Sequence, residues 1–206
     1  MKRCKRAARM LIGGIGLVAL LFLALALINN RESARRATCR NNLYNLHSAL
    51  SRYRSEHNHL PEGNSAVEIV AALIEGGYLG TGLDNYYGTP VHVCPGSGRD
   101  VAAWMQTAAL AEQTCSYDIV EGVDLDSPPD FALAFDRSPC AHFQRSLWHI
   151  VRQRNVLLVG SPLAITYAEE EFQRRMAWQR DMMKRLEEGG EHIPFREWRS
   201  KGNGEQ

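Results

Sequence analysis

Residues 10–30 read MLIGGIGLVALLFLALALINN, and no charged side chain interrupts them. Met10–Ile28 is apolar or glycine throughout. At about 1.5 Å of rise per residue, a helix over Met10–Ile28 covers roughly 28 Å, which is close to the hydrocarbon thickness of a bilayer. The stretch therefore predicts a transmembrane helix over residues 10–30, in contact with lipid through Met10–Ile28. A buried core helix of the same composition is the alternative.

Basic residues flank this stretch on both sides. Five precede it and four follow it: Lys2, Arg3, Lys5, Arg6 and Arg9, then Arg31, Arg35, Arg36 and Arg40. Lysine and arginine concentrate on the cytoplasmic side of membrane helices, so the first five predict a cytoplasmic N-terminus, although the other four weaken the bias. We expect a single-pass protein of the inner (cytoplasmic) membrane with a periplasmic C-terminal domain. A signal peptide cleaved near Ala24-Leu25-Ala26 is the alternative.

The helical pattern continues beyond the membrane stretch. Apolar residues recur there at spacings of four, three, four and three, which place them on one face of a helix: Cys39, Leu43, Leu46, Leu50 and Tyr53. Leu60-Pro61 favours extended backbone, so we expect the helix to end at about Glu56. The result is a long rod, with its first half in lipid and its second half packed on a domain.

The rest of the chain predicts a small antiparallel sheet and further helices. A short helix should begin at the N-cap Ser65, with Glu68 completing a capping box, and end at Gly76-Gly77. Strands are expected at residues 91–93, 116–120, 131–135, 155–159 and 164–167, with a small helix at 101–113. A C-terminal helix should follow, with one apolar face and two favourable ion pairs: Phe172, Met176, Met183 and Leu186, and Glu170–Arg174 and Glu171–Arg175.

The predicted organisation is therefore an α+β fold on a membrane helix. Residues 1–9 form a cytoplasmic basic segment, and residues 10–30 cross the membrane. Residues 31–188 form one extracytoplasmic domain, and residues 189–206 form a polar, loose tail after Gly189-Gly190. After removal of the first 30 of 206 residues, the remaining length suits one domain better than two.

The sequence gives no sign of an enzyme or a nucleic-acid binder. A formal net charge of +1 argues against a concentrated basic face for nucleic acid. Asp136, His142 and His149 are candidates for an acid–base or metal cluster, but a polar set at a sheet edge explains them as well. Because no Gly-x-Ser-x-Gly or comparable nucleophile signature is present, we expect no catalytic site and no cofactor.

Four of the five cysteines follow the membrane stretch, on the side where disulfides persist: Cys39, Cys94, Cys115 and Cys140. Four thiols allow three pairings, which sequence alone cannot distinguish. Cys94 and Cys115 bracket the segment between two predicted strands, so we predict their bridge and, with less support, Cys39–Cys140. The absence of a Cys-x2-Cys pair disfavours a zinc site.

Local motifs resemble those of the type IV pilins and type II secretion pseudopilins. They include Ala34-Arg35-Arg36 followed by Cys39, then Asn41-Asn42-Leu43, and further on Asp84, Gly88 and Pro90. His149, with nine residues before Val159-Gly160, is similar to the His-x9-Asp-Gly spacing of one pseudopilin-like family, with valine in place of the aspartate. The resemblance implies a structural or assembly component of a type II secretion-like or pilus-like apparatus, with other pilin-like subunits as partners.

One feature of the membrane stretch departs from that family pattern. Pilin precursors carry a glutamate five residues into the mature chain, whereas no acidic residue follows Gly13, Gly14 or Gly16 before Asn30. This favours the alternative of a tethered binding or scaffold module that kept the fold without assembling.

The resemblance also makes Asp84 a candidate calcium ligand. One carboxylate is too few for a Ca²⁺ site, and the sequence does not place Asp124 and Asp126 beside it.

Overall fold

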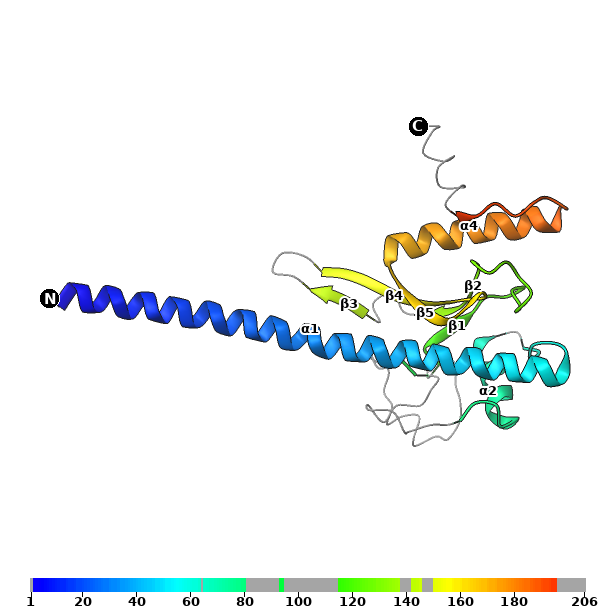
Figure 1. The fold of residues 1–206 in the computed structure, drawn as a ribbon, viewed down its shortest axis with the longest axis horizontal. Helices are drawn as coiled ribbons and strands as arrows, with labels where there is room; N and C mark the ends of the chain where they lie inside the picture. Colours follow the sequence, from blue (N-terminus) through cyan, green and yellow to red (C-terminus); the bar gives the residue numbers. More distant parts are fainter. Residues whose placement is uncertain are drawn as a thin grey trace.

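The computed structural model describes residues 2–63, 65–80, 93–94, 115–137, 142–145 and 150–195, with side chains from residue 13 onward except at 142–145. The described elements follow the chain in this order: α1 (Lys2–His57), α2 (Ala66–Glu75), β1 (Tyr117–Ile119), β2 (Ala132–Asp136), β3 (His142–Arg145), β4 (Ile150–Leu158), β5 (Ser161–Ala168) and α4 (Glu169–Glu187). The expected helix at 101–113 and most of the expected strand at 91–93 lie outside the described residues. The predicted α+β fold is confirmed (Figure 1).

The first helix is one unbroken rod of 56 residues, which at 1.5 Å per residue is about 84 Å long. Its first part projects away from the rest of the molecule, and its last part lies against the sheet (Figure 1). The helix ends at His57, one residue beyond the expected end, and Asn58 then takes a left-handed conformation with φ 64°. The extended Leu60-Pro61 step follows, as predicted.

The predicted apolar stripe on the second half of α1 is confirmed. Cys39, Leu43, Leu46 and Leu50 are at most 2 % exposed, and Tyr53 packs at the margin of the same core. Spacings of three and four keep these side chains on one face, because the helix turns once every 3.6 residues. This face anchors the sheet to the rod.

The sheet is antiparallel and centred on β4. β5 pairs with one edge of β4, while β3 and β2 share the other edge, beside residues 150–153 and 156–158 respectively. β1 extends the sheet beyond β2. The sheet therefore has five strands but is four strands wide at its centre. Four strands match predicted runs, although β4 begins five residues before the expected 155, and β3 was not predicted.

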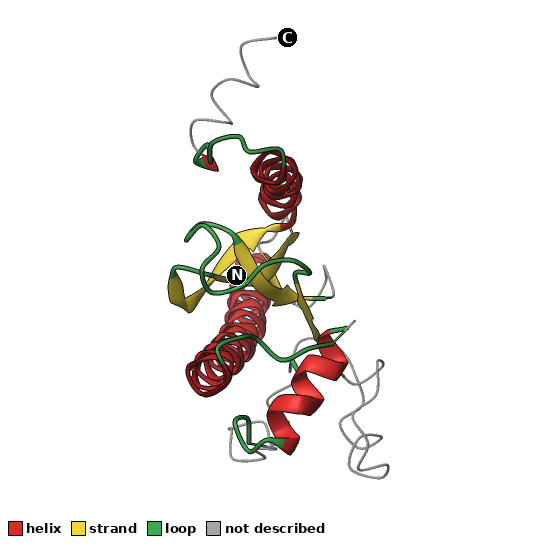
Figure 2. Ribbon diagram, turned by 90° about the vertical axis from the view of Figure 1, so that its right-hand side faces the viewer, coloured by secondary structure: helices red, strands yellow, loops and turns green. Residues whose placement is uncertain are grey.

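Helices cover both faces of this sheet. Figure 2 shows α4 on one side and α1 with α2 on the other. Alternation along the strands supplies both cores: Leu133 and Leu157 join the core that α1 and α2 share, whereas Ala132 and Val156 pack with residues of α4. A period of two along a strand turns successive side chains to opposite faces, which explains how the short strands contribute to two cores.

The short helix α2 begins as predicted. Ser65 is its N-cap, and its hydroxyl accepts a hydrogen bond from the Glu68 amide at 3.3 Å. Val70 and Leu73 are fully buried against the rod side of the sheet. The helix ends at Gly76, and Gly77 takes the left-handed conformation, φ 73°, that glycine adopts without steric cost.

Two features of the C-terminal region differ in part from the expectation. The buried face of α4 includes the predicted Phe172 and Met176 but continues through Trp178, Gln179 and Met182, whereas Leu186 is 36 % exposed. The expected loose tail is packed as far as Phe195. Trp178 explains both results, because its indole donates to the Ile193 carbonyl at 2.9 Å, and its ring contacts Phe195 at a centroid distance of 5.6 Å.

Candidate functional site

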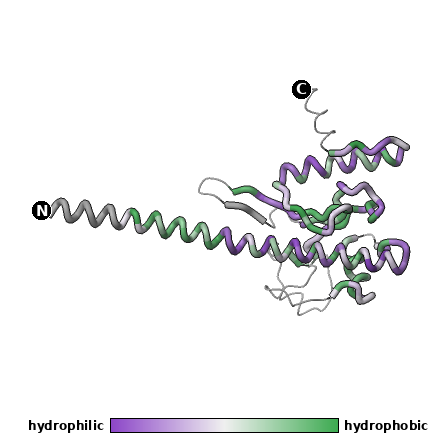
Figure 3. Tube along the Cα trace, viewed as in Figure 1, coloured by the Kyte–Doolittle hydropathy of each residue, from purple (hydrophilic) through white to green (hydrophobic). Residues whose placement is uncertain are grey.

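The first half of α1 is apolar and exposed. Leu25 is partly exposed, and eight other large side chains between residues 15 and 27 are more than half exposed: Ile15, Leu17, Val18, Leu20, Leu21, Phe22, Leu23 and Leu27. Figure 3 shows this hydrophobic run ending where the helix nears the sheet. An apolar surface that surrounds a helix completely is unstable in water, and the helix is long and apolar enough to cross a membrane. These features are consistent with a single-pass membrane anchor.

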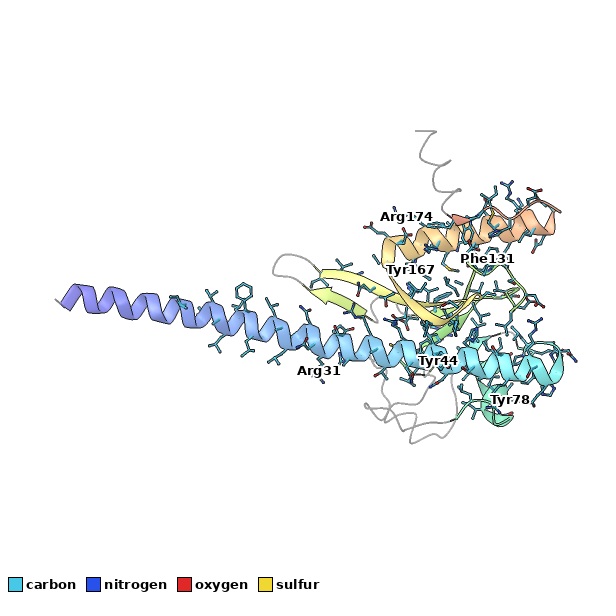
Figure 4. The ribbon with its side chains drawn as sticks, in the orientation of Figure 1. Arg31, Tyr44, Tyr78, Phe131, Tyr167 and Arg174 are labelled. Carbon is cyan, nitrogen blue, oxygen red and sulfur yellow. The ribbon has the colours of Figure 1, made fainter. Side chains whose placement is uncertain are left out.

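The end of this apolar surface coincides with the first contacts of the domain. Figure 4 labels Arg31 at this junction. One turn later, Arg35 pairs with the buried Glu32 at 3.8 Å, and the Arg36 guanidinium donates to the Gln153 side chain of β4. The strands therefore reach α1 about two turns after the end of the apolar stretch at Ile28. A domain anchored in this way lies close to the membrane surface.

A polar cluster lies buried between the second half of α1 and the sheet. The sulfur atoms of Cys39 and Cys94 and a carboxylate oxygen of Asp136 lie within 4.8 Å of one another. All three residues are at most 1 % exposed. The Cys39 thiol donates to Asp136 Oδ1 at 2.8 Å, and the Tyr117 hydroxyl lies 3.3 Å from the same sulfur. This thiol cluster is defined as Cys39, Cys94, Tyr117 and Asp136.

Each member of the thiol cluster comes from a different part of the fold. Cys39 is in the apolar stripe of α1, Tyr117 opens β1, and Asp136 closes β2 directly opposite Tyr117 in the strand register. Asp136 Oδ2 also accepts from the Asn155 amide of β4 at 2.8 Å. Cys94 is positioned through its neighbour, because the Asn42 side chain donates to the Val93 carbonyl at 3.1 Å.

Burial dominates the acid–base behaviour of the cluster. It raises the pKa of the Cys39 thiol well above its usual range, and the neighbouring Cys94 and Asp136 raise it further. Burial likewise raises the pKa of the Tyr117 phenol, with the charges of Cys39, Cys94 and Asp136 acting in the same direction. Removal from water disfavours the anionic forms, so both groups are held neutral. A buried neutral thiol is a poor nucleophile, which fits a structural rather than a catalytic group.

The predicted disulfides are not seen among the described residues. Cys94 and Cys115 are both buried, and the bridge between them stays a prediction. Cys115 instead donates to the Tyr117 carbonyl at 3.4 Å, and Cys94 lies beside Cys39. The Asn42–Val93 hydrogen bond holds Cys94 against α1. The Cys39–Cys140 prediction involves a residue outside the described part of the chain.

The three polar candidates of a possible acid–base cluster do not form an open site within the described residues. Asp136 is the last residue of β2 and is fully buried. His142 lies on β3, but its side chain is not described, and His149 lies outside the described residues. Nothing observed brings either histidine to the carboxylate, and the prediction that the chain is not an enzyme stays a prediction.

Gly160, from the His-x9-Asp-Gly-like motif, has a clear structural role. Gly160 forms the tight turn between β4 and β5 and donates its amide to the Pro129 carbonyl at 2.9 Å. A Cβ atom at Gly160 would lie 2.3 Å from Pro129 Cβ, so only glycine allows this contact. Asp84, Gly88, Pro90 and His149 of these motifs lie outside the described residues.

The aspartates considered with Asp84 for calcium have other partners. Asp124 Oδ1 accepts from the amides of Asp126 and Ser127 at 2.8 and 2.9 Å, which is a side-chain-capped turn. Asp126 pairs with Arg54 on α1. These bonds explain both carboxylates without an ion, and the calcium proposal gains no support from this loop.

Sequence reasoning missed a buried arginine on the other face of the sheet. The Arg154 guanidinium pairs with Glu169 at 2.7 Å and donates to the Asp136 carbonyl at 3.0 Å. It also lies over the Phe172 ring, 4.2 Å from the centroid. Extending the predicted strand back to residue 150 would have placed Arg154 on the face of Val156, towards α4. The interaction joins the sheet to the first turn of α4.

Comparison with known proteins bears on the first part of this architecture. Residues 29–129 match a family model, SBP_bac_10, protein of unknown function (DUF1559). This family is associated with pilin-like, prepilin-type proteins. The match begins in α1 at the end of the apolar stretch and continues through α2 and β1. No curated protein and no solved structure matches the chain.

Proposed function

We propose that this chain is a membrane-anchored, pseudopilin-like structural or assembly component of a type II secretion-like or pilus-like apparatus. The observation that carries the proposal is the single helix α1, which is exposed and apolar up to residue 28 and becomes a core element of the domain from Cys39. One rigid element then links lipid to the domain. In this proposal the N-terminus is cytoplasmic and the domain is periplasmic.

The match to a pilin-associated family supports the assembly role. A helix that is apolar all round suits association with other membrane helices, because every side of it offers van der Waals contact. On the domain, a shallow groove between α1 and β5 offers a second surface, and it includes Tyr44 (42 % exposed) and Leu163 (62 % exposed). Other pilin-like subunits are the proposed partners at both surfaces.

The same helix favours a minor subunit over a fibre-forming one. No acidic side chain occurs between Met10 and Asn30. In a packed fibre core, a charged N-terminus would then lack an intramembrane carboxylate partner, at a cost of several kcal/mol. This observation also favours the second candidate function, a tethered binding or scaffold module that works without assembling. The two candidates differ in whether the anchor touches another pilin-like chain.

Photo-crosslinking in intact membranes separates the two candidates. A photoreactive phenylalanine analogue is placed at Leu20 in the anchor, at Tyr44 in the domain groove, or at Arg180 on α4 as an exposed control. The assembly role predicts a discrete adduct from Leu20 and Tyr44 to another pilin-like subunit, identified by mass spectrometry, and none from Arg180. Adducts to lipid alone from Leu20, with no protein adduct from Tyr44, would support the tethered module.

The orientation is tested on spheroplasts. Protease added outside should digest the domain, whereas Cys4 should react with a membrane-impermeant thiol reagent only after the membrane is opened. Labelling of Cys4 in intact spheroplasts would contradict the proposed topology.

A further inference from the structure

We propose that Cys39 and Cys94 form a disulfide bond, which joins α1 covalently to Val93-Cys94. The proposal rests on the periplasmic placement of the domain given above, because disulfides persist in that compartment. Neither the family match nor the predicted Cys94–Cys115 pairing assigns this bond.

The geometry brings the two sulfur atoms together by independent contacts. Both thiols are in the buried cluster, with sulfur atoms within 4.8 Å of each other. Cys39 is fixed because it lies in the apolar stripe of a continuous helix. Val93, which precedes Cys94, is held by Asn42, one helical turn beyond Cys39. Rotation about the Cα–Cβ bonds changes sulfur positions by more than an ångström, which allows the closure of this gap to about 2.05 Å.

The bond requires an oxidant of the thiol–disulfide class, such as a periplasmic dithiol oxidase in its disulfide form. One cysteine thiolate attacks the oxidant's disulfide and displaces one of its sulfurs as a thiol. The second cysteine thiolate then attacks the resulting mixed disulfide, forming the Cys39–Cys94 bond and releasing the second thiol. Two S–H bonds break and one S–S bond forms, and the two protons and two electrons reduce the oxidant.

Burial determines when this reaction takes place and how long its product lasts. The folded protein keeps the Cys39 thiol neutral and away from solvent, which makes it unreactive. Oxidation is therefore expected during folding, before the sheet covers α1. Once formed, the bond is shielded from reductants by the same burial.

The same sulfur and carboxylate oxygen atoms could instead bind a metal ion. The described part of the cluster offers two thiols and one carboxylate, with Tyr117 as a fourth oxygen, whereas structural zinc sites use four sulfur or imidazole ligands. One oxygen of Asp136 already accepts a hydrogen bond from the Asn155 amide. The disulfide uses only the two sulfurs and leaves the Asn155 hydrogen bond in place.

The bond would fix the domain on the rod just beyond the membrane surface. Cys39 lies nine residues after Asn30, the last residue of the uncharged stretch. A cross-link there closes a loop of 55 residues (94 − 39). Loops of this size restrict the unfolded chain strongly, so its loss should lower the melting temperature by about 10 °C.

The test uses the full-length protein extracted from membranes under acid quench and thiol blocking. Non-reducing peptide mapping should find Cys39 joined to Cys94, with Cys115 blocked as a free thiol. Reduction should lower the melting temperature of the natural protein by about 10 °C but leave a Cys39→Ala, Cys94→Ala double variant unchanged. A Cys115→Ser variant is the matched control and should keep the Cys39–Cys94 peptide.

Three results would overturn the proposal. One is a peptide joining Cys94 to Cys115 or Cys140. Another is stoichiometric zinc on free Cys39 and Cys94, measured by elemental analysis of protein extracted without chelator. The third is free Cys39 and Cys94 without metal. If these thiols are free while protease digests the domain in spheroplasts, the disulfide alone is wrong. If the domain is also protected from protease, the proposed topology is wrong as well.

Discussion

The two halves of α1 share one continuous backbone and have opposite surroundings. Between residues 13 and 30 every described side chain is exposed or partly exposed. Between Cys39 and Leu50 the helix carries side chains that are completely buried. The first half is apolar on all faces, whereas the second half is apolar on one face and polar on the other.

The difference shows what each half needs from its environment. A helix apolar all round requires an apolar solvent, and nothing described in this chain provides one for residues 13–28. A helix with one apolar stripe requires a partner of matching shape, which the sheet provides. The transition takes place between Arg31 and Arg36: Arg35 pairs with Glu32 of the same helix, and Arg36 donates to Gln153 of β4. Because the helix is continuous, the apolar half and the domain are held at a fixed separation.

Truncating one leucine in each half should give the largest contrast. Leu50→Ala removes a fully buried side chain and should destabilise the domain by about 2–5 kcal/mol. Leu20→Ala, at a position 64 % exposed outside the domain, should leave the domain's free energy of unfolding unchanged. Urea unfolding of both variants in mild detergent, followed by the fluorescence of the buried Trp178, measures the difference. Equal losses in both variants would mean that the two halves do not differ as described.

Glycines offer a second contrast between the anchor and the domain. Gly160→Ala places a Cβ atom 2.3 Å from Pro129 Cβ, which must move with its ring, so a loss of about 1–3 kcal/mol is expected. Gly14→Ala in the anchor meets nothing within 4 Å and should leave domain unfolding unchanged. The same urea titration reports both. A Gly160→Ala domain of natural stability would show that the β4–β5 turn adjusts freely.

Adjacent asparagines sharpen the contrast within the second half itself. Asn42 is 1 % exposed and donates to the Val93 carbonyl, whereas Asn41 is exposed on the groove side. Asn42→Ala leaves a buried carbonyl without this donor and should cost about 1–2 kcal/mol. Asn41→Ala should stay within about 0.5 kcal/mol of the natural protein. Similar effects for the two substitutions would contradict the assigned anchoring of Cys94.

The sequence was informative where one strong periodicity decided the structure. The uncharged run and the stripe from Cys39 to Tyr53 predicted α1 to within one residue of its end. The runs that became β1, β2, β4 and β5 were also located, because short β-branched or aromatic segments between turns favour strands. The tight Gly160 turn was visible as a motif, although its contact with Pro129 was not.

The features that the sequence did not predict depend on contacts between residues far apart in the chain. Trp178 of α4 is buried against Ile193 and Phe195, which the predicted apolar face did not include. A helical pattern alone does not reveal which of two adjacent faces has a partner. Cys94 lies beside Cys39 because of a side-chain to backbone hydrogen bond across 51 residues. A hydrogen bond across so many residues leaves no local pattern in the sequence, so the position of Cys94 beside Cys39 was not predicted.

His47 gives the smallest expected effect and tests the domain half of α1 through pH. Burial lowers the pKa of His47 below the usual histidine value, and its hydrogen bond to the Val159 backbone raises it by a smaller amount. The unfolded chain therefore binds the His47 proton at a higher pH than the folded chain does. This contribution to stability is fully present above pH 6.5 and is lost as the pH falls through the folded-state pKa.

We therefore expect the natural protein to lose stability between about pH 7 and pH 5 more steeply than a His47→Gln variant does. The other ionisable groups are common to both chains, so the difference between their pH profiles isolates this side chain. Urea unfolding at half-unit pH intervals measures it. Parallel profiles would show that the His47 imidazole is as well solvated in the folded domain as in the unfolded chain, and that α1 is not closely covered by the β4–β5 turn at this position.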